Sequence, residues 1–135
     1  MGYYIKFISK ELKLRKDTPQ EVIDFINNCV NAHIFDVTIN HKLFTLERWN
    51  NMFVSNYWLK EKTYFKNENG KWKFRTSCEI NYGRDEILEF AKWISPYVAG
   101  HKPKEFIGEL KGENREDRQN VYIERAVAVT AKNEK

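Results

Sequence analysis

The sequence predicts an α+β fold of the ferredoxin-like (split βαβ) plait type, with an antiparallel sheet and two main helices on one of its faces. Apolar residues alternate at the start of the chain and again in its second half. Two stretches, 22–30 and 87–94, carry apolar residues at helical spacing. Asn69-Gly70 lies between two strand-like runs, which is a strong hairpin signal. We expect the order βαββαβ, with a short extra helix and an extra C-terminal strand.

The first strand is predicted over residues 3–14, with a bulge near Ser9-Lys10. The run Thr18-Pro19-Gln20-Glu21 is typical of a helix start, with Thr18 as the cap, Pro19 at the first helical position and Glu21 closing a capping box. The helix that follows is expected to end near Asn31 and to carry apolar residues on one face: Val22, Phe25, Ile26, Cys29 and Val30.

A connector is predicted over residues 33–42, with a short extended piece that contains Ile34, Val37 and Ile39. Thr45 is then expected to cap a second, short helix, whose buried side contains Leu46, Trp49, Met52 and Phe53.

The hairpin is predicted over residues 57–80, and two pairing registers are compatible with its sequence. If Asn69-Gly70 is a two-residue turn, Lys66 faces Lys73 and Tyr64 faces Arg75; if residues 67–70 all loop out, Tyr64 faces Lys73 and Lys62 faces Arg75. Both registers sort the side chains onto the same two faces. One face is expected to be core: Leu59, Phe65, Trp72, Phe74, Cys78 and Ile80. The other is a basic strip with aromatic residues: Trp58, Lys60, Lys62, Tyr64, Lys66, Lys71, Lys73 and Arg75.

Glu61 falls on the expected core face of this hairpin. Three interpretations stay open: it pairs with a cation, it lies at the sheet margin, or the register is wrong.

The run Asn81-Tyr82-Gly83 is expected to end the second strand of the hairpin. The next helix should carry Asp85 and Glu86 in its first turn, where the helix dipole favours negative charge, and should stop at Pro96 to Gly100. Its buried face is expected to contain Ile87, Phe90, Ala91 and Ile94.

A strand over residues 105–111 should place Phe106 and Leu110 on one face. A charged turn over 112–119 and a last strand follow, the strand carrying Val121, Ile123, Val127 and Val129 with Arg125 on the same side. No linker divides the chain, so we expect one domain over 1–130 and a loose tail over 131–135.

Composition indicates a folded protein, since 41% of the 135 residues are hydrophobic and 15% aromatic. No apolar run is long enough to cross a bilayer and no signal segment opens the chain, so we expect a cytoplasmic protein without membrane contact. Cys29 and Cys78 both fall on apolar faces and suit buried thiols. The net charge of +4 permits a polyanionic partner without requiring one.

We expect no catalytic residues, because no nucleophile with a plausible base and no glycine-rich phosphate loop occurs in the sequence. We expect no cofactor and no metal, because the spacing of His33, Asp36 and His41 matches no usual metal site. The candidate contacts are instead the basic strip and two arginines of the charged turn, Arg115 and Arg118, which suit a phosphate or an acidic protein surface. In the competing interpretation, the lysines only protect a sheet edge and the turn is simply solvated.

Four segments carry a resemblance: ERWNNMF (47–53), RTSCEI (75–80), FAKWISPYV (90–98) and EFIG (105–108). In this order they resemble small uncharacterised proteins encoded by phages and prophages of AT-rich Gram-positive bacteria. The resemblance spans most of the chain after about residue 18. The chain departs from it at 112–118, where the charges are mixed instead of acidic and aromatic. The resemblance implies a compact inhibitor of host defence, of the anti-CRISPR kind.

The resulting hypothesis is a non-enzymatic binding protein that inhibits a host defence complex by steric occlusion. Its partner would be an acidic protein surface or a nucleoprotein site. One alternative is direct nucleic-acid binding, which predicts an affinity that falls steeply with salt. The other is a protein that sequesters a nucleotide signal with Arg115, Arg118 and a stacking aromatic residue. The oligomeric state is not predicted.

Overall fold

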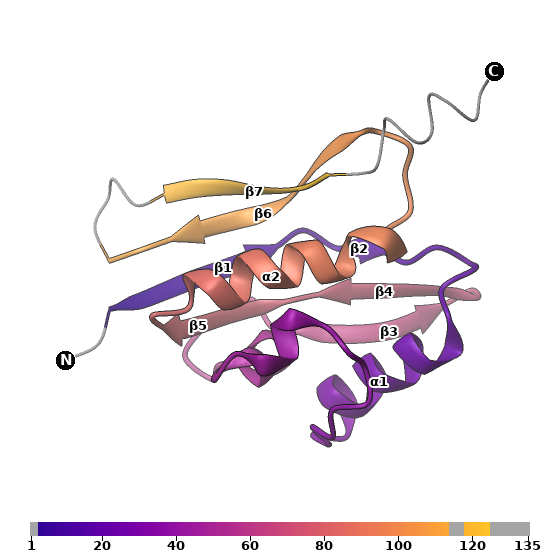
Figure 1. The fold of residues 1–135 in the computed structure, drawn as a ribbon, viewed down its shortest axis with the longest axis horizontal. Helices are drawn as coiled ribbons and strands as arrows, with labels where there is room; N and C mark the ends of the chain where they lie inside the picture. The colour runs from indigo at the N-terminus through magenta and orange to yellow at the C-terminus, as the bar shows by residue number, and fades with distance from the viewer. Residues whose placement is uncertain (1–2, 114–117, 125–135) are drawn as a thin grey trace.

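The computed structural model describes residues 3–113 and 118–124, which form an antiparallel α+β fold (Figure 1). The elements follow in the order β1 (Tyr4–Ser9), β2 (Leu12–Lys13), α1 (Gln20–Asn31), η1 (Lys42–Thr45), η2 (Trp49–Phe53), β3 (Tyr64–Glu68), β4 (Lys71–Arg75), β5 (Ser77–Asn81), α2 (Arg84–Ile94), η3 (Ser95–Tyr97), β6 (Lys104–Lys111) and β7 (Arg118–Glu124). Here η marks a 3-10 helix.

The strands form two sheets, a four-stranded sheet in the order β5-β1-β6-β7 and a three-stranded sheet in the order β2-β4-β3. The pairing changes register where β1 leads into β2: Ile8 lies opposite Ser77, whereas Leu12 lies opposite Phe74. One strand therefore holds one residue more than its partner, which confirms the bulge predicted near Ser9-Lys10. At this bulge the single sheet that we expected divides into two.

Helix α1 has the predicted apolar face but not the predicted cap. Val22, Phe25 and Cys29 are buried, and the helix ends at Asn31 as expected. The capping box is wrong, because Pro19 is the N-terminal cap residue and no side chain caps the helix. The Thr18 hydroxyl instead donates back to the Arg15 carbonyl oxygen at 2.6 Å.

The segment between α1 and β3 is less regular than predicted. Residues 33–41 form no strand, and Ile34 and Val37 are exposed. Two 3-10 turns, η1 and η2, replace the expected short helix. His41 caps η1, since its Nδ1 accepts a hydrogen bond from the Leu43 amide at 3.0 Å, whereas Thr45 is the last residue of η1. Both turns bury apolar residues, so two short 3-10 turns supply the core with the side chains that one continuous helix was expected to supply.

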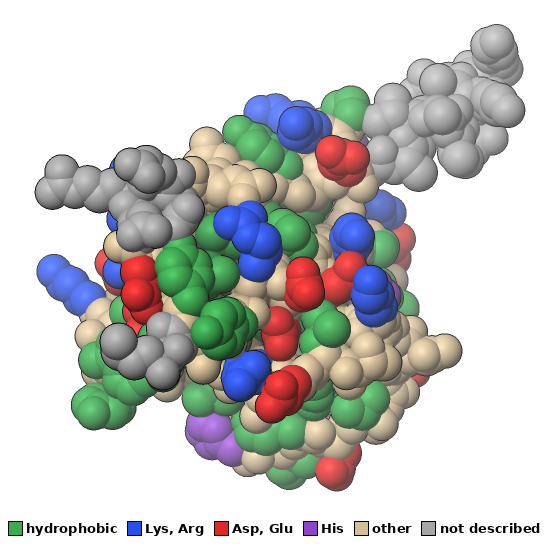
Figure 2. All heavy atoms as spheres, turned by 60° about the vertical axis from the view of Figure 1, so that its left-hand side comes forward, with side chains coloured by type: hydrophobic (Ala, Val, Ile, Leu, Met, Phe, Trp, Pro, Cys, Tyr) green, Lys and Arg blue, Asp and Glu red, His purple; other side chains and the backbone are tan. Residues whose placement is uncertain are grey.

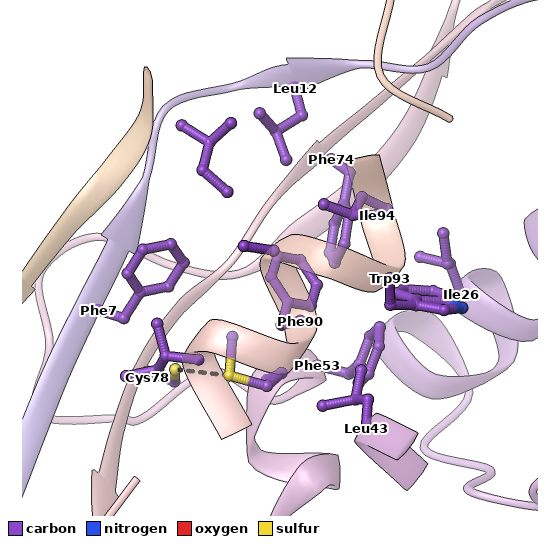
Figure 3. Close-up of a cluster of buried hydrophobic side chains, with 14 of the residues drawn as sticks. Phe7, Leu12, Ile26, Leu43, Phe53, Phe74, Cys78, Phe90, Trp93 and Ile94 are labelled. Carbon is purple, nitrogen blue, oxygen red and sulfur yellow. Dashed lines mark hydrogen bonds between the residues drawn. The ribbon is translucent and has the colours of Figure 1, made fainter. Parts of the chain in front are cut away.

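Both helices pack their apolar faces into one aromatic core (Figure 3). The Phe53 ring stacks on the Phe74 ring with centroids 5.9 Å apart, and it also contacts Phe25 of α1 and Phe90 and Trp93 of α2. The predicted buried face of α2 is confirmed. Glu86 of α2 is also buried, and its carboxylate accepts a hydrogen bond from the Arg48 amide at 3.0 Å, which attaches η2 to the helix.

Strand β6 contains a second irregularity, which makes one prediction wrong. Phe106 is 40% exposed and Leu110 is fully buried, so they do not share a face. The register shifts between Phe106 and Gly108, and Ile107 takes the inward position. The neighbouring strand sets this geometry: a Cβ at Gly108 would lie 2.6 Å from the Ile8 carbonyl oxygen.

The last strand is described only to Glu124, where Val121 and Ile123 are buried as predicted. The predictions for Arg125, Val127, Val129 and the tail concern residues outside those that the structure describes. In the part of the chain that the structure describes, no helix has the length and apolar character needed to span a membrane.

Candidate binding surface

The β3–β4 hairpin adopts the first of the two expected registers. Lys66 pairs with Lys73, and Tyr64 pairs with Arg75. Asn69 and Gly70 have φ angles of 55° and 81°, the positive values that a tight two-residue hairpin turn requires. The two-residue turn predicted from the local sequence is therefore confirmed.

Strand β2 extends this hairpin into a three-stranded sheet by pairing Lys13 with Lys73. Lys13, Lys73 and Lys66 thus form a row across the outer side of the three strands, which lie about 4.8 Å apart. Lys13 is not among the residues predicted for the basic strip, although its place between the buried Leu12 and Leu14 marks an outward side chain. We call this outer side the basic sheet face, and define it by the residues Lys13, Tyr64, Lys66, Lys71, Lys73 and Arg75.

Tyr64 lies at the centre of the contacts on the basic sheet face. The Lys66 ammonium lies 4.7 Å from the centre of its ring and the Arg75 guanidinium 5.0 Å from it. The Tyr64 hydroxyl donates to the carboxylate of Glu11. Burial and the contact with Glu11 raise the pKa of Tyr64 to about 12, so the phenol stays protonated at neutral pH.

Two glutamates offset part of the positive charge of this face. Lys73 Nζ lies 2.7 Å from a Glu68 carboxylate oxygen and 3.8 Å from a Glu11 oxygen, and Lys66 Nζ lies 3.2 Å from Glu68. These side chains are partly exposed, so their ion pairs contribute little to stability and can exchange for a partner's anionic groups.

The prediction that the strand includes residues 57–62 is wrong, because β3 begins only at Tyr64. Lys60 lies in the turn that replaces the strand and is exposed. The Lys62 ammonium turns back to the carbonyl oxygens of Asn56 and Tyr57, at 2.8 and 3.1 Å. Trp58 Nε1 donates to the Glu79 carboxylate of β5 at 3.2 Å. Trp58, Lys60 and Lys62 therefore belong to a loop beside β5 and not to the strand pair.

Glu61 lies in the same turn and is partly exposed. Its expected core position followed from extending the strand register beyond Tyr64, and this extension is wrong.

Side chains of the loop close the outer edge of β5. Thr63 Oγ1 accepts a hydrogen bond from the Ser77 amide at 2.9 Å and donates to the Ser77 carbonyl oxygen at 3.0 Å. Asn56 Oδ1 accepts from the Glu79 amide at 2.8 Å. The loop therefore satisfies edge groups that a neighbouring strand would otherwise pair with.

Arg118 begins β7 and is not brought together with the basic sheet face. Its Nε lies 3.5 Å from a Glu109 carboxylate oxygen on the four-stranded sheet. Arg115 lies outside the described residues. The nucleotide-sequestering alternative, which uses both arginines, gains no support from the geometry.

The face of the molecule that Figure 2 presents has mixed charge. Figure 2 shows lysines and arginines interspersed with acidic side chains on the face that it presents. A shallow depression of about 370 Å³ on the four-stranded sheet is lined by two lysines, two glutamates, Tyr4 and Gly112. Among residues 3–113 and 118–124, no three His, Cys, Asp or Glu side chains form a group that could hold a metal. Both cysteines are buried, which raises the pKa of each thiol to about 12.

Comparisons with protein-family models, with curated proteins and with solved structures give no match to this chain.

Proposed function

We propose that this chain is a non-enzymatic binding protein whose basic sheet face contacts a polyanionic surface of its partner. Residues 60–75 contain six lysines and arginines and two glutamates, a net charge of +4. The whole chain also has a net charge of +4, so the remaining residues are balanced. The hairpin and the loop before it therefore carry a local excess of positive charge, and this observation carries the proposal.

The proposed action is inhibition of a host defence complex by steric occlusion, in the cytoplasm, where free buried thiols are stable. Antiparallel strands hold the basic groups in place, so the face can cover an acidic or nucleoprotein surface without first becoming ordered. The sequence resemblance to phage-borne proteins supports the context, and the charge distribution supports the type of partner.

We also propose that the two sheets are halves of one strongly bent plait. Following β1 into β2 and β4 into β5 gives the order β6, β1–β2, β4–β5, β3, which is the strand order of a split βαβ fold with β7 added outside β6. An experimental structure with a different order would reject this assignment.

A charge-reversal experiment tests the proposed function. In the test variant, Lys13, Lys66 and Lys71 become glutamate; these side chains are exposed and, unlike Lys62, do not hold loop carbonyls. The matched control changes Lys6, Lys104 and Lys111 of the four-stranded sheet to glutamate, and alters the net charge equally.

Each tagged variant is used to capture partners from host lysate, with and without nuclease. We expect the test variant to lose the captured complex and the control to keep it. Equal capture by both variants, each shown to be folded by circular dichroism, would reject the basic sheet face as the contact.

A further inference from the structure

We infer that Tyr57 and Trp58 form a base-stacking site for single-stranded nucleic acid, whose phosphates lie along the basic sheet face. This inference rests on the proposed function, because it names nucleic acid as the polyanion that the face contacts.

The first observation is the exposure of two neighbouring aromatic rings. Tyr57 is 88% exposed and Trp58 55% exposed, and their ring centroids lie 5.1 Å apart at an interplanar angle of 82°. Leu59, the next residue, is only 7% exposed. The loop therefore buries Leu59 and leaves both rings in solvent, where their apolar surface is available to a ligand.

The second observation is that polar contacts hold the loop in place. Trp58 Nε1 donates to Glu79, and the Lys62 ammonium bonds to the Asn56 and Tyr57 carbonyl oxygens. The Trp58 ring and the backbone that carries Tyr57 are thus positioned before a ligand arrives, which lowers the entropy cost of binding.

The third observation is the continuity between the loop and the basic sheet face. Lys62 holds the loop through its ammonium group, and its carbonyl oxygen accepts a hydrogen bond from Arg75 Nε at 3.0 Å. Arg75 in turn contacts the Tyr64 ring. A strand of nucleic acid that stacks on the loop therefore meets cationic groups next to it.

In this arrangement the exposed rings of the loop contact the bases, and the cationic side chains of the sheet contact the phosphates. The Tyr64 ring already contacts the cations of Lys66 and Arg75, so stacking is assigned to the loop and phosphate contact to the sheet. The net charge of +4 over residues 60–75 complements a phosphate backbone. Duplex bases are already stacked on one another, so the geometry favours a single strand.

The test uses a fluorescent oligothymidylate of about 20 nucleotides, longer than the usual site size, and a duplex of equal length. We expect the intact chain to bind the single strand more tightly than the duplex, with affinity falling as salt rises. The double variant Tyr57→Ala/Trp58→Ala should bind about tenfold or more weakly without a change in the salt slope. Replacing Lys13, Lys66 and Lys71 with glutamine should lower that slope by roughly 2, because each lost phosphate contact removes about 0.7.

Two further variants separate stacking from structural damage. Phe106→Ala/Tyr122→Ala removes another exposed aromatic pair, with centroids 5.9 Å apart, and should bind as the intact chain does. Trp58→Phe keeps a ring but loses the indole and its bond to Glu79, so its affinity should lie between that of the intact chain and that of Tyr57→Ala/Trp58→Ala, and part of the tryptophan quenching caused by the bound strand should be lost.

No binding of the oligothymidylate at low salt, or unchanged binding by Tyr57→Ala/Trp58→Ala, would overturn the inference. If the oligothymidylate does not bind but host-protein capture survives nuclease and needs Lys13, Lys66 and Lys71, the basic sheet face contacts protein and not nucleic acid. The proposed function then stands and the inference fails. If capture does not depend on these lysines, the proposed function itself fails.

Discussion

Replacing Thr63 with valine removes the hydroxyl that closes the edge of β5, and we expect the fold to lose about 3 kcal/mol of stability. Thr63 is 8% exposed and Ser77 is fully buried, so water does not readily replace the lost contacts. The hydroxyl bonds to both the amide and the carbonyl of Ser77. Each buried group left without a partner costs about 1–3 kcal/mol, and the added methyl group returns less than about 1 kcal/mol.

Urea unfolding followed by circular dichroism measures this loss. With a slope of about 1–3 kcal/mol per molar urea, the midpoint should fall by roughly 1–3 M and the slope should not change. Thr63→Ser keeps a hydroxyl and should restore most of the stability. Thr45→Val is the matched control, because its hydroxyl bonds to the Lys42 carbonyl at an exposed site. A Thr63→Val midpoint equal to that of Thr45→Val would refute the edge-closing role.

Three further predictions concern backbone packing and titration. Gly108→Ala should lower the melting temperature far more than Gly70→Ala. A Cβ at residue 108 would lie 2.6 Å from a backbone oxygen of β1, whereas a Cβ at residue 70 would meet nothing within 4 Å and only the φ angle of 81° opposes it. Equal shifts in melting temperature would contradict the close approach of β6 to β1. The pKa of Tyr64 is raised from 10.0 to about 12, so its stabilisation is complete below pH 10 and is lost as pH rises toward 12. Urea midpoints across this range should therefore fall less in Tyr64→Phe, and identical decline in both proteins would argue against a raised pKa. Cys29 and Cys78 should react slowly with a thiol reagent in the native state and quickly in denaturant. Burial raises the pKa of each thiol to about 12 and so keeps it protonated. Rapid labelling of the native protein would contradict the burial of the two thiols.

The hairpin shows what short-range sequence patterns predict well. Asn69-Gly70 favours the positive φ angles of a two-residue turn, and the alternation around it places Phe65 and Phe74 inward. The apolar faces of α1 and α2 follow the same logic, because helical spacing places those residues on one side.

The errors arise where distant segments meet. Alternation continues through residues 57–62, yet the chain turns there, and Thr63 closes the edge of β5 with its side chain. Phe106 and Leu110 have the spacing of one strand face, yet the close approach of β6 to β1 at Gly108 accompanies a register shift between them.

The sequence by itself determined the turn, the two helices and which side of the β3–β4 hairpin is apolar, because these depend on neighbouring residues and on the period of the backbone. Only the tertiary structure decided that Lys13 completes the row of lysines, that Glu11 and Glu68 offset part of the charge, and that Trp58 lies beside β5. A strand's pattern shows which way a side chain points, but the pairing of segments far apart in the chain decides which side chains it meets.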